Sequence, residues 1–543
     1  MMLPLTPILG AIATIALIVR VLLIGRRPRN YPPGPPTLPV LGNIHQMPTQ
    51  DAHLQFEKWA REYGPIYSLM LGTQCLIVLS SDVAVKDLLD KRSAIYSDRQ
   101  EMYIGQVLCS GGLRLLMMRY GPTWRMFRKM VHGLLNVVTS RNYVPYQMLE
   151  NKQMLYELLT EPEGFLKHIR RYSNALTTTM VFGWRTPTYE DRKMKQLFDG
   201  FSAFAEINQT GAAAFIDFFP LLRKLPAFML PAQNTARELH THEKALYKGH
   251  WMKAKEDIRN DNINPCFSIG MYDAQKKDGF SDDQACYISG TLLEAGSDTT
   301  SSTLYAFVQA MLLFPDVQRK AQEEIDRVVG PHRLPVMDDL ADLQYIRGCM
   351  KETLRWMPTT ILGAVPHAVT QDDEYMGYFI PKGAGVVNNV WANHMDPKRH
   401  PSPREFNPER YKDDRQSLGD AAANPDGSKR DAFTFGAGRR ICPGIHVAER
   451  SLFLGMSRIL WAFDIAPEID GNGKAIIPDP DRLTQGFVCM PEEFPARITQ
   501  RSKGRADTVT KEWKDAEREC LDPTTKQWLQ SPIEGVKALR GVS

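Results

Sequence analysis

A glycine-rich segment near the carboxyl-terminal end combines residue types that can hold a metal. Residues 435–444 have the sequence Phe-Gly-Ala-Gly-Arg-Arg-Ile-Cys-Pro-Gly. Glycine lets a backbone adopt unusual φ values and approach a flat, bulky group closely. The two arginines offer charge-assisted donors for carboxylates. The cysteine can direct its sulfur at a metal while nearby N–H groups tune that sulfur. The alternative for this segment alone is a glycine-rich turn around an inert core cysteine.

A second group of residues could move protons. Residues 295–300 have the sequence Ala-Gly-Ser-Asp-Thr-Thr, inside a long helical pattern. Glycine inside a helix costs about 1 kcal/mol relative to alanine, so a compensating role is expected there. A threonine hydroxyl can bond back to a helix carbonyl and open the helix slightly. Asp298 beside Thr299 therefore offers positioned donors for proton delivery; the alternative is a helix break with Asp298 as its cap.

Two further pairs have helical spacing. Glu352 and Arg355 lie three apart, so they share a helix face and can form an ion pair. Trp124 and Arg128 lie four apart and could both donate to one carboxylate. Taken alone, the first is typical of a solvated surface pair and the second of a cation–π pair.

In order and position, these motifs resemble the cytochrome P450 family over nearly the whole chain. Residues 435–444 match the family's haem loop, Phe-x-x-Gly-x-Arg-x-Cys-x-Gly, which ends here at Gly444. The resemblance implies that the Cys442 thiolate is the axial ligand of a haem b iron and pushes electron density to favour O–O cleavage. It also implies that Phe435 packs near the haem and that Arg440 pairs with a haem propionate.

The resemblance assigns roles to the other motifs too. Glu352, Arg355 and Arg410, the last from a Pro-Glu-Arg-Tyr segment, are implied to form a buried structural triad near the haem loop. Asp298 and Thr299 are implied to be the acid–alcohol pair that carries protons to iron-bound oxygen.

Three residues are implied to meet the haem propionates. Trp124 and Arg128 correspond to the family's Trp-x-x-x-Arg helix. His367 stands where the family often has a basic residue near the other propionate, and a satisfied core histidine is its alternative.

Hydrophobic periodicity predicts a mainly α fold with small β-sheets, and the resemblance makes it the cytochrome P450 fold with an N-terminal transmembrane helix. We expect one haem-thiolate domain over residues 38–502, followed by a polar tail, 503–543, of unassigned role with a helix at 507–519. The other helices are expected at 50–62, 81–92, 121–136, 190–206, 235–262, 281–312, 315–329 and 342–356, and strands at 66–71, 75–79 and 385–389.

The first 30 residues are expected to form a membrane anchor with a helix at about 5–25. About 20 apolar residues span the roughly 30 Å hydrocarbon core of a membrane, and Arg20 near one end can snorkel to the interface. Arginines at 26, 27 and 29 favour a cytosolic body, as in a single-pass protein of the endoplasmic reticulum. A cleaved signal peptide is the alternative, but Ala11-Ile12-Ala13 lies inside the apolar run rather than after it. Residues 31–37 are expected to be a stiff proline-rich hinge.

Composition excludes some classes of function. The net charge is +4, from 66 basic and 62 acidic residues spread along the chain, which argues against nucleic-acid binding. Eight cysteines without a Cys-x-x-Cys pair argue against a disulfide framework or a zinc site. The apolar segment 217–230, broken by proline, is either a core loop or a substrate-entrance loop that dips into the bilayer.

The resemblance implies a monooxygenase that inserts one oxygen atom from O2 into a hydrophobic small molecule with electrons from NADPH. No stretch resembles a flavin or nicotinamide domain, so NADPH-cytochrome P450 reductase is implied as a separate partner, with cytochrome b5 as a second donor and membrane lipid around the anchor. The particular residues within these motifs resemble those of fungal enzymes of secondary metabolism, including the O-methylsterigmatocystin oxidoreductase-like group. The alternatives are a haem-thiolate isomerase or dehydratase that needs no reductase, and a non-enzymatic haem protein.

The resemblance also places the substrate pocket. Its walls are expected from residues 99–120, 201–215, 289–294, 359–365 and 484–488. Glu294 is an unusual charge for an apolar pocket. We expect it either to face away or to recognise a polar group of the substrate.

Overall fold

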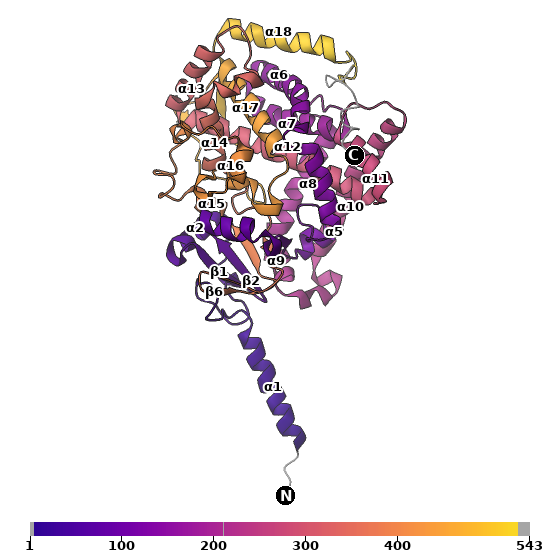
Figure 1. Ribbon diagram of the computed structural model, residues 1–543, viewed down its shortest axis with the longest axis vertical. Helices are drawn as coiled ribbons and strands as arrows, with labels where there is room; N and C mark the ends of the chain where they lie inside the picture. Colours follow the sequence, from indigo (N-terminus) through magenta and orange to yellow (C-terminus); the bar gives the residue numbers. More distant parts are fainter. Residues whose placement is uncertain (1–4, 210, 530–543) are drawn as a thin grey trace.

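The computed structural model describes residues 5–209 and 211–529, and shows a mainly helical body from which the first helix, α1, projects (Figure 1). Its helices are α1 Leu5–Leu23, α2 Ala52–Tyr63, α3 Asp82–Val85, α4 Ser93–Tyr96, α5 Pro122–Leu135, α6 Val144–Thr160, α7 Phe165–Phe182, α8 Arg192–Gln209, α9 Gly211–Phe218, α10 Pro231–Arg259, α11 Phe267–Asp278, α12 Asp282–Leu313, α13 Pro315–Val328, α14 Gln344–Trp356, α15 Val390–His394, α16 Leu418–Ala423, α17 Ile445–Ala462 and α18 Lys503–Cys520.

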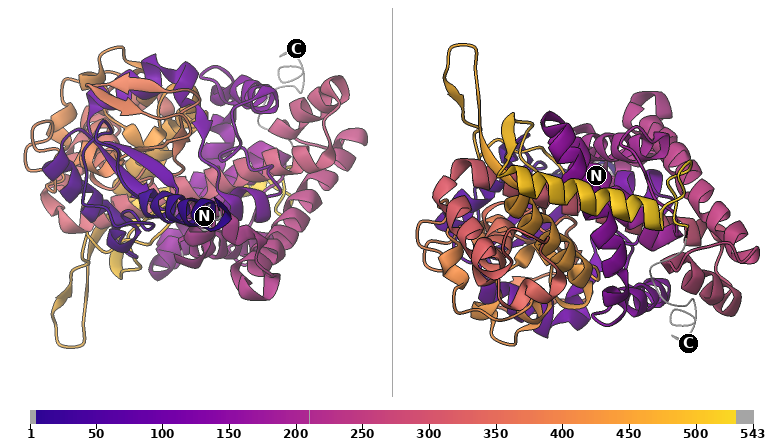
Figure 2. Two further views of the ribbon diagram at one scale, coloured as in Figure 1. Left: turned by 90° about the horizontal axis from the view of Figure 1, so that it is seen from below. Right: turned by 90° about the horizontal axis from the view of Figure 1, so that it is seen from above.

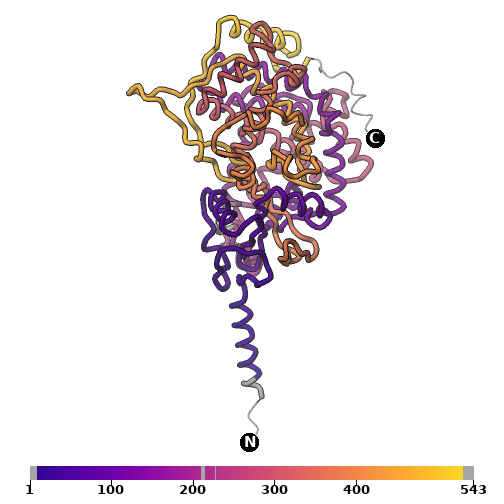
Figure 3. The backbone as a smooth tube through the Cα atoms, turned by 60° about the vertical axis from the view of Figure 1, so that its left-hand side comes forward, coloured from indigo at the N-terminus to yellow at the C-terminus, as the bar shows by residue number. Residues whose placement is uncertain are grey.

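Three small sheets accompany the helices. The strands are β1 Ile66–Leu71, β2 Gln74–Leu79, β3 Asp98–Arg99, β4 His367–Ala368, β5 Asp373–Tyr375, β6 Tyr378–Ile380, β7 Gly385–Asn388, β8 Phe463–Ile469, β9 Ala475–Ile476 and β10 Ala496–Gln500. The main sheet has the order β1-β2-β7-β4-β3, and the others have the orders β10-β8-β9 and β5-β6. The β8–β9 hairpin projects from the body (Figures 2 and 3). In the main sheet the register pairs Arg99 with His367, so two basic side chains begin on neighbouring strands.

Helix α12 runs through the body and packs against α7, α10 and α17. It begins at a capping box, in which Ser281 accepts a hydrogen bond from the N–H of Gln284 and the Gln284 side chain accepts one from Ser281. Such a box satisfies two otherwise unpaired N–H groups of the first turn. Close packing explains a glycine of α12 as well, because a Cβ on Gly290 would collide with the ring of Tyr247 on α10.

The predicted mainly α fold is observed. Each predicted strand is present, and seven of the predicted internal helices appear within a few residues of their expected bounds. The segment 81–92 is not one regular helix, because α3 gives way to a π-helical turn at Lys86–Lys91. Sequence periodicity missed α6, α7 and α17. Helix α7 and most of α17 are buried on nearly all sides, so they carry no polar stripe for periodicity to detect.

Arg27 is one of the residues that attach the N-terminal segment to the sheet, together with the Pro33 carbonyl, which accepts the N–H of Ser68 at 2.8 Å. Arg27 donates hydrogen bonds to the carbonyls of Gly34 (2.8 Å) and Pro35 (2.9 Å) and to the carbonyl of Ser68 on β1 (2.8 Å). It therefore fixes the proline-rich segment against the body rather than acting only as a flanking charge. Helix α1 coincides with the predicted anchor helix, although residues 1–4 lie outside the described residues. Among the described residues, no helix meets the length and hydropathy expected of a membrane span.

The segment 217–230 is not a core loop. It continues from α9 into two short 3-10 turns, Pro220–Lys224 and Ala227–Met229. Leu221 is 79% exposed and Phe228 is 82% exposed, which contradicts burial in a core. The Gln74 side chain donates to the Asp217 carbonyl at 2.8 Å. The segment thus lies against the β1–β2 turn, at the end of the body from which α1 projects (Figure 1).

The polar C-terminal segment begins as a helix packed on the body. Helix α18 starts at Lys503, four residues before the predicted start, and buries Val509 and Trp513 (Figure 2, right). Beyond it, the carbonyl of Lys526 accepts a hydrogen bond from Arg185 at 2.8 Å. The end of the described chain is therefore tied to the body.

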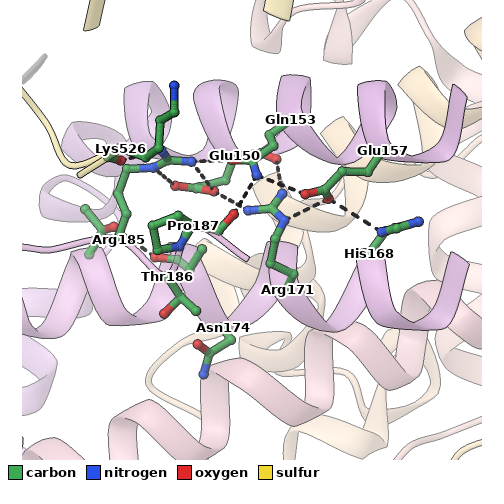
Figure 4. Close-up of polar contacts among 12 residues, drawn as sticks. Glu150, Gln153, Glu157, His168, Arg171, Asn174, Arg185, Thr186, Pro187 and Lys526 are labelled. Carbon is green, nitrogen blue, oxygen red and sulfur yellow. Dashed lines mark hydrogen bonds and ion pairs between the residues drawn. The ribbon is translucent and has the colours of Figure 1, made fainter. Parts of the chain in front are cut away.

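Arg185 belongs to a buried ion-pair cluster between α6 and α7 (Figure 4). Glu150, which is fully buried, forms ion pairs with Arg185 and with Arg171 (2.8 Å). Arg171 also pairs with Glu157 at 2.7 Å. Alternating charges satisfy each other here, as buried charges require.

Candidate active site

A cavity of about 330 Å³ lies beside α12 and brings together residues that are far apart in the sequence. All but one of the predicted haem-contacting and proton-delivering residues line it: Trp124, Arg128, Asp298, Thr299, His367, Phe435, Arg440 and Cys442. Gly444 stands just behind this lining, since a Cβ on it would lie 3.8 Å from the Cys442 sulfur. The expected pocket segments contribute as well, through Arg114, Phe201, Phe204, Thr359 and Phe487 among others.

The loop that carries Cys442 is held by its own backbone. The Cys442 N–H donates to the Phe435 carbonyl at 2.8 Å, closing the loop on itself. Gly436 has φ +76° and Gly438 has φ +58°, values that favour glycine. A Cβ on Gly438 would collide with the Leu89 carbonyl. This glycine is therefore required by packing against the protein's own backbone rather than by approach to a bound group.

Burial raises the pKa of the Cys442 thiol above its ordinary value, while the Gly444 N–H and the Arg128 charge act in the opposite direction. The sulfur lies in the cavity wall beside Pro443. A thiolate at this position would be a ligand suited to a soft metal ion.

Of the four arginines that line the cavity, three donate their hydrogen bonds to backbone carbonyls of the protein. Arg440 donates to Ser97 (2.9 Å) and Met118 (2.8 Å). Arg99 donates to Leu116 (3.1 Å) and Val365, and Arg128 donates to Ile441. The described chain forms no salt bridge to any of these three. Arg440 also lies over the Trp124 ring, 4.1 Å from its centre, so the expected cation–π pair of Trp124 forms with Arg440 rather than Arg128.

This arginine cluster fits a dianionic ligand. Burial lowers the pKa of Arg440 to about 8 and that of Arg99 to about 10, and the Arg99 charge further lowers that of Arg440. Buried like charges are costly unless a counter-charge is present. The two propionates of a haem would supply it, facing the same cavity as the cysteine sulfur. Arg99 was not predicted as a propionate partner, because only the β3–β4 pairing brings it beside His367.

His367 is a buried histidine with a hydrogen-bond partner at the cavity wall. Its Nδ1 lies 2.8 Å from the Tyr96 carbonyl, which can only accept, so Nδ1 carries the proton. Burial and the neighbouring Arg99 hold its pKa well below the ordinary value. The local geometry of His367 is therefore that of a buried histidine with a satisfied hydrogen bond, as in the core-histidine alternative. Its contact with a haem propionate stays a prediction. For Nε2 to donate to a propionate, it would have to take up a proton.

The structure brings the three residues of the Glu352 triad together, with Glu352 and Arg355 buried and Arg410 partly buried. Arg355 donates to both carboxylate oxygens of Glu352, at 2.7 and 2.8 Å, and Arg410 donates to one of them at 3.2 Å. Arg355 also donates to the His394 carbonyl at 3.1 Å, and His394 Nε2 accepts the N–H of Phe433 at 3.1 Å. His394 thus connects the triad to the start of the haem loop. No spacing in the sequence marked it, because each partner is 39 residues away.

We expect Glu352→Gln to lower the free energy of unfolding by about 3–5 kcal/mol, because it leaves Arg355 and Arg410 without their buried counter-charge. Urea unfolding followed by circular dichroism measures this. The control is Glu409→Gln, whose partner Lys320 is exposed and 3.7 Å away, with an expected change of about 0.5 kcal/mol or less. Equal effects of the two substitutions would contradict a stabilising role of the Glu352 triad.

The proton-delivery pair lies one turn beyond a close helix contact. A Cβ on Gly296 would collide with Thr177 of α7, which explains the glycine inside α12. The Thr299 hydroxyl donates back to the Ala295 carbonyl at 2.7 Å, as expected for a helix opened at this point. Asp298 is half-buried at the cavity wall, and burial raises its pKa to about 6, opposed by the Arg170 charge. Asp298 lies within the helix and is not its cap.

Comparison with known proteins agrees with this geometry. The Cytochrome P450 family model matches residues 32–494, so the chain belongs to this family. It is a cytochrome P450 monooxygenase, and the family implies a haem-thiolate cofactor, a reductase partner and a small-molecule substrate. The chain is 54% identical to the monooxygenase virE of Hypocrea virens, covering 95% of this chain and 93% of the relative. It is 50% identical to fogE of Aspergillus ruber (92% and 93% covered) and 47% identical to fsoB of Humicola fuscoatra (94% of each).

Proposed function

We propose that the chain binds haem b through the Cys442 thiolate and inserts one oxygen atom from O2 into a hydrophobic small molecule. The observation that carries this proposal is a cavity that has Cys442 in its wall and, beside it, the buried Arg99 and the partly buried Arg128 and Arg440, none of which forms a salt bridge within the described chain. When bound, the haem supplies the iron at which O2 is activated. In this proposal Arg99, Arg128 and Arg440 hold the propionates.

Helix α12 supplies the proton route in this proposal. The Thr299 hydroxyl lies in the cavity wall, and the adjoining Asp298 carboxyl has a pKa of about 6, raised by burial. A carboxyl with such a pKa can both accept and release a proton near neutral pH. Asp298 is therefore assigned to take up and release the proton. The Thr299 oxygen, whose own proton is bonded to the Ala295 carbonyl, is assigned to accept a hydrogen bond in the cavity. An isomerase or a haem carrier has no need of this pair.

The electron donor in this proposal is NADPH-cytochrome P450 reductase, with cytochrome b5 as a second donor. The setting is the cytosolic face of the endoplasmic reticulum membrane. Apolar side chains exposed around α1, including Leu9, Ile12, Ile15 and Leu17, support membrane attachment. Leu221 and Phe228 are exposed at the same end of the body and would add a second lipid contact. Because the relatives named above come from fungi, we place the reaction in fungal secondary metabolism.

Reduction under carbon monoxide tests the enzyme class without knowledge of the substrate. In microsomes that contain the full chain and a reductase, NADPH should produce the red-shifted absorption of a thiolate-ligated ferrous haem. Leaving out the reductase should prevent it. Absence of this absorption with reductase and NADPH present would refute haem-thiolate ligation. Conversion of terpenoid, polyketide or aromatic precursors at an unchanged rate without reductase would instead favour an isomerase or dehydratase.

Alkaline extraction of the same microsomes tests the anchor. The full chain should stay with the membrane, whereas a variant lacking residues 1–24 should be largely released. If both remain bound to the same extent, α1 is not the anchor.

A further inference from the structure

A buried polar cluster forms part of the wall of the substrate cavity. Arg114 forms ion pairs with Glu294 of α12 and Glu243 of α10. The Tyr247 hydroxyl donates to the other oxygen of Glu294, and Arg114 Nε donates to the Ser110 hydroxyl at 3.1 Å. Arg114 and Glu294 line the cavity. Glu294 was expected either to face away from the pocket or to recognise a polar group of the substrate. Its carboxylate is paired inside the protein, and the residue lines the cavity.

The wall around this cluster is apolar. Neighbouring lining residues are Leu115, Leu116, Phe201, Phe204, Leu292 and Phe487. The Arg114 guanidinium lies over the Phe204 ring, 4.2 Å from its centre. A molecule filling this part of the cavity therefore meets a polar cluster set in a mostly hydrophobic surface, which is how binding pockets fix orientation.

The charges of the cluster favour an uncharged hydrogen-bond donor. One guanidinium faces two carboxylates, so the cluster has a surplus of acceptors. One oxygen of Glu243 is buried without a hydrogen-bond partner in the described part of the chain. Burial, with repulsion from Glu243, raises the pKa of Glu294 to about 7 against the effects of Arg114 and Tyr247. A substrate carboxylate would meet a neutral or negative site, and an ammonium group would have to be desolvated beside Arg114. A hydroxyl has neither disadvantage.

We propose that Glu294, positioned by Arg114 and Tyr247, accepts a hydrogen bond from a hydroxyl of the substrate, so that the enzyme selects uncharged, hydroxyl-bearing apolar molecules. This inference rests on the proposed monooxygenase function. Glu294 precedes Thr299 by five residues, which separates them by about 7.5 Å along the helix axis. The hydroxyl would therefore be held away from the proton-delivery pair, with the apolar part of the molecule extending toward it.

Binding titrations of the haem-loaded full chain test this inference. The probes are 1-decanol, its methyl ether 1-methoxydecane, and decanoate, each followed through the change in haem absorption. A hydrogen bond to a charged group contributes about 1.5–3 kcal/mol. We therefore expect at least a tenfold preference for the alcohol over the ether, and weaker binding of decanoate. Glu294→Leu should reduce the preference for the alcohol to less than about threefold.

Glu243→Leu is the matched control. Each substitution leaves Arg114 paired with the remaining carboxylate, so each variant keeps a balanced ion pair. Only Glu294 lines the cavity, and removing Glu243 also removes the charge that disfavours ionised Glu294. Glu243→Leu should therefore retain or increase the preference for the alcohol. A purely structural role predicts equal loss in both variants.

Failure of the hydroxyl-recognition inference can be told apart from failure of the proposed monooxygenase function. Equal binding of alcohol and ether by the wild-type protein, or no binding of the alcohol, overturns the inference and leaves the haem assignment intact. So does an unchanged preference in Glu294→Leu. Loss of the carbon monoxide spectrum in the wild-type protein would instead overturn the proposed function itself.

Discussion

Cys442→Ser is expected to abolish the red-shifted carbon monoxide absorption of the reduced protein and to reduce turnover to background. Serine retains the size and the backbone hydrogen bond to Phe435, but its hydroxyl cannot replace a thiolate as a soft, electron-donating ligand. The absorption spectrum of the reduced, carbon monoxide-treated protein measures the ligation directly. NADPH-dependent product formation measures the consequence.

Cys75→Ser serves as the control for that substitution. Cys75 is partly buried like Cys442 but lies on β2, away from the cavity lining. It should leave the spectrum at the wild-type position. If Cys442→Ser keeps the red-shifted absorption, this cysteine is not the iron ligand, whatever the activity.

Asp298→Asn is expected to slow product formation by about 10²- to 10⁴-fold, the usual contribution of a positioned acid or base, while binding and the carbon monoxide spectrum persist. Asparagine keeps the shape of the side chain but cannot exchange a proton near neutral pH. The measurement is NADPH-driven turnover in the presence of reductase. Undiminished turnover would exclude Asp298 from proton delivery.

Asp298→Asn is also expected to change the thermal stability of the protein in a pH-dependent way. Burial raises the pKa of Asp298 from 3.8 to about 6, so its favourable contribution is full below pH 3.8 and is lost as the pH rises through 6. Asp298→Asn should therefore unfold at a higher temperature than the wild type above pH 6, and at a similar temperature near pH 3.8. Asp283→Asn is the control on the same helix. Lys244 holds the pKa of Asp283 below its ordinary value, so this substitution should give no stabilisation above pH 6. A carboxylate that costs stability yet delivers protons is the pattern expected at an active site.

Local hydrophobic period was sufficient for much of the fold, whereas the roles of the candidate site residues came from the resemblance of their motifs to the cytochrome P450 family. Helix α12, strands β1 and β2, and the Glu352–Arg355 pair follow from period and composition within one segment. The haem loop was identified because its residues are consecutive, so no long-range contact was needed to group them. The family comparison then agreed with that interpretation over residues 32–494.

Positions that depend on distant partners were decided only in three dimensions. Gly438 must be a glycine because a Cβ there would collide with the Leu89 carbonyl. His394 links Arg355 to Phe433 through hydrogen bonds to both. The exposure of the segment 217–230 is likewise a tertiary fact, because an apolar sequence is compatible with either a core or a surface position.

By itself, then, the sequence determined the mainly helical class of fold and much of the order of its elements, since these are encoded in neighbouring residues, and its consecutive motif at residues 435–444 predicted Cys442 as the haem ligand through the family resemblance. The tertiary structure decided which buried charges balance one another. Arg114 pairs with Glu294, 180 residues away, and Glu150 pairs with Arg171 and Arg185. Hydrophobic period and motif spacing record which side of a segment is buried, but they do not record what it is buried against.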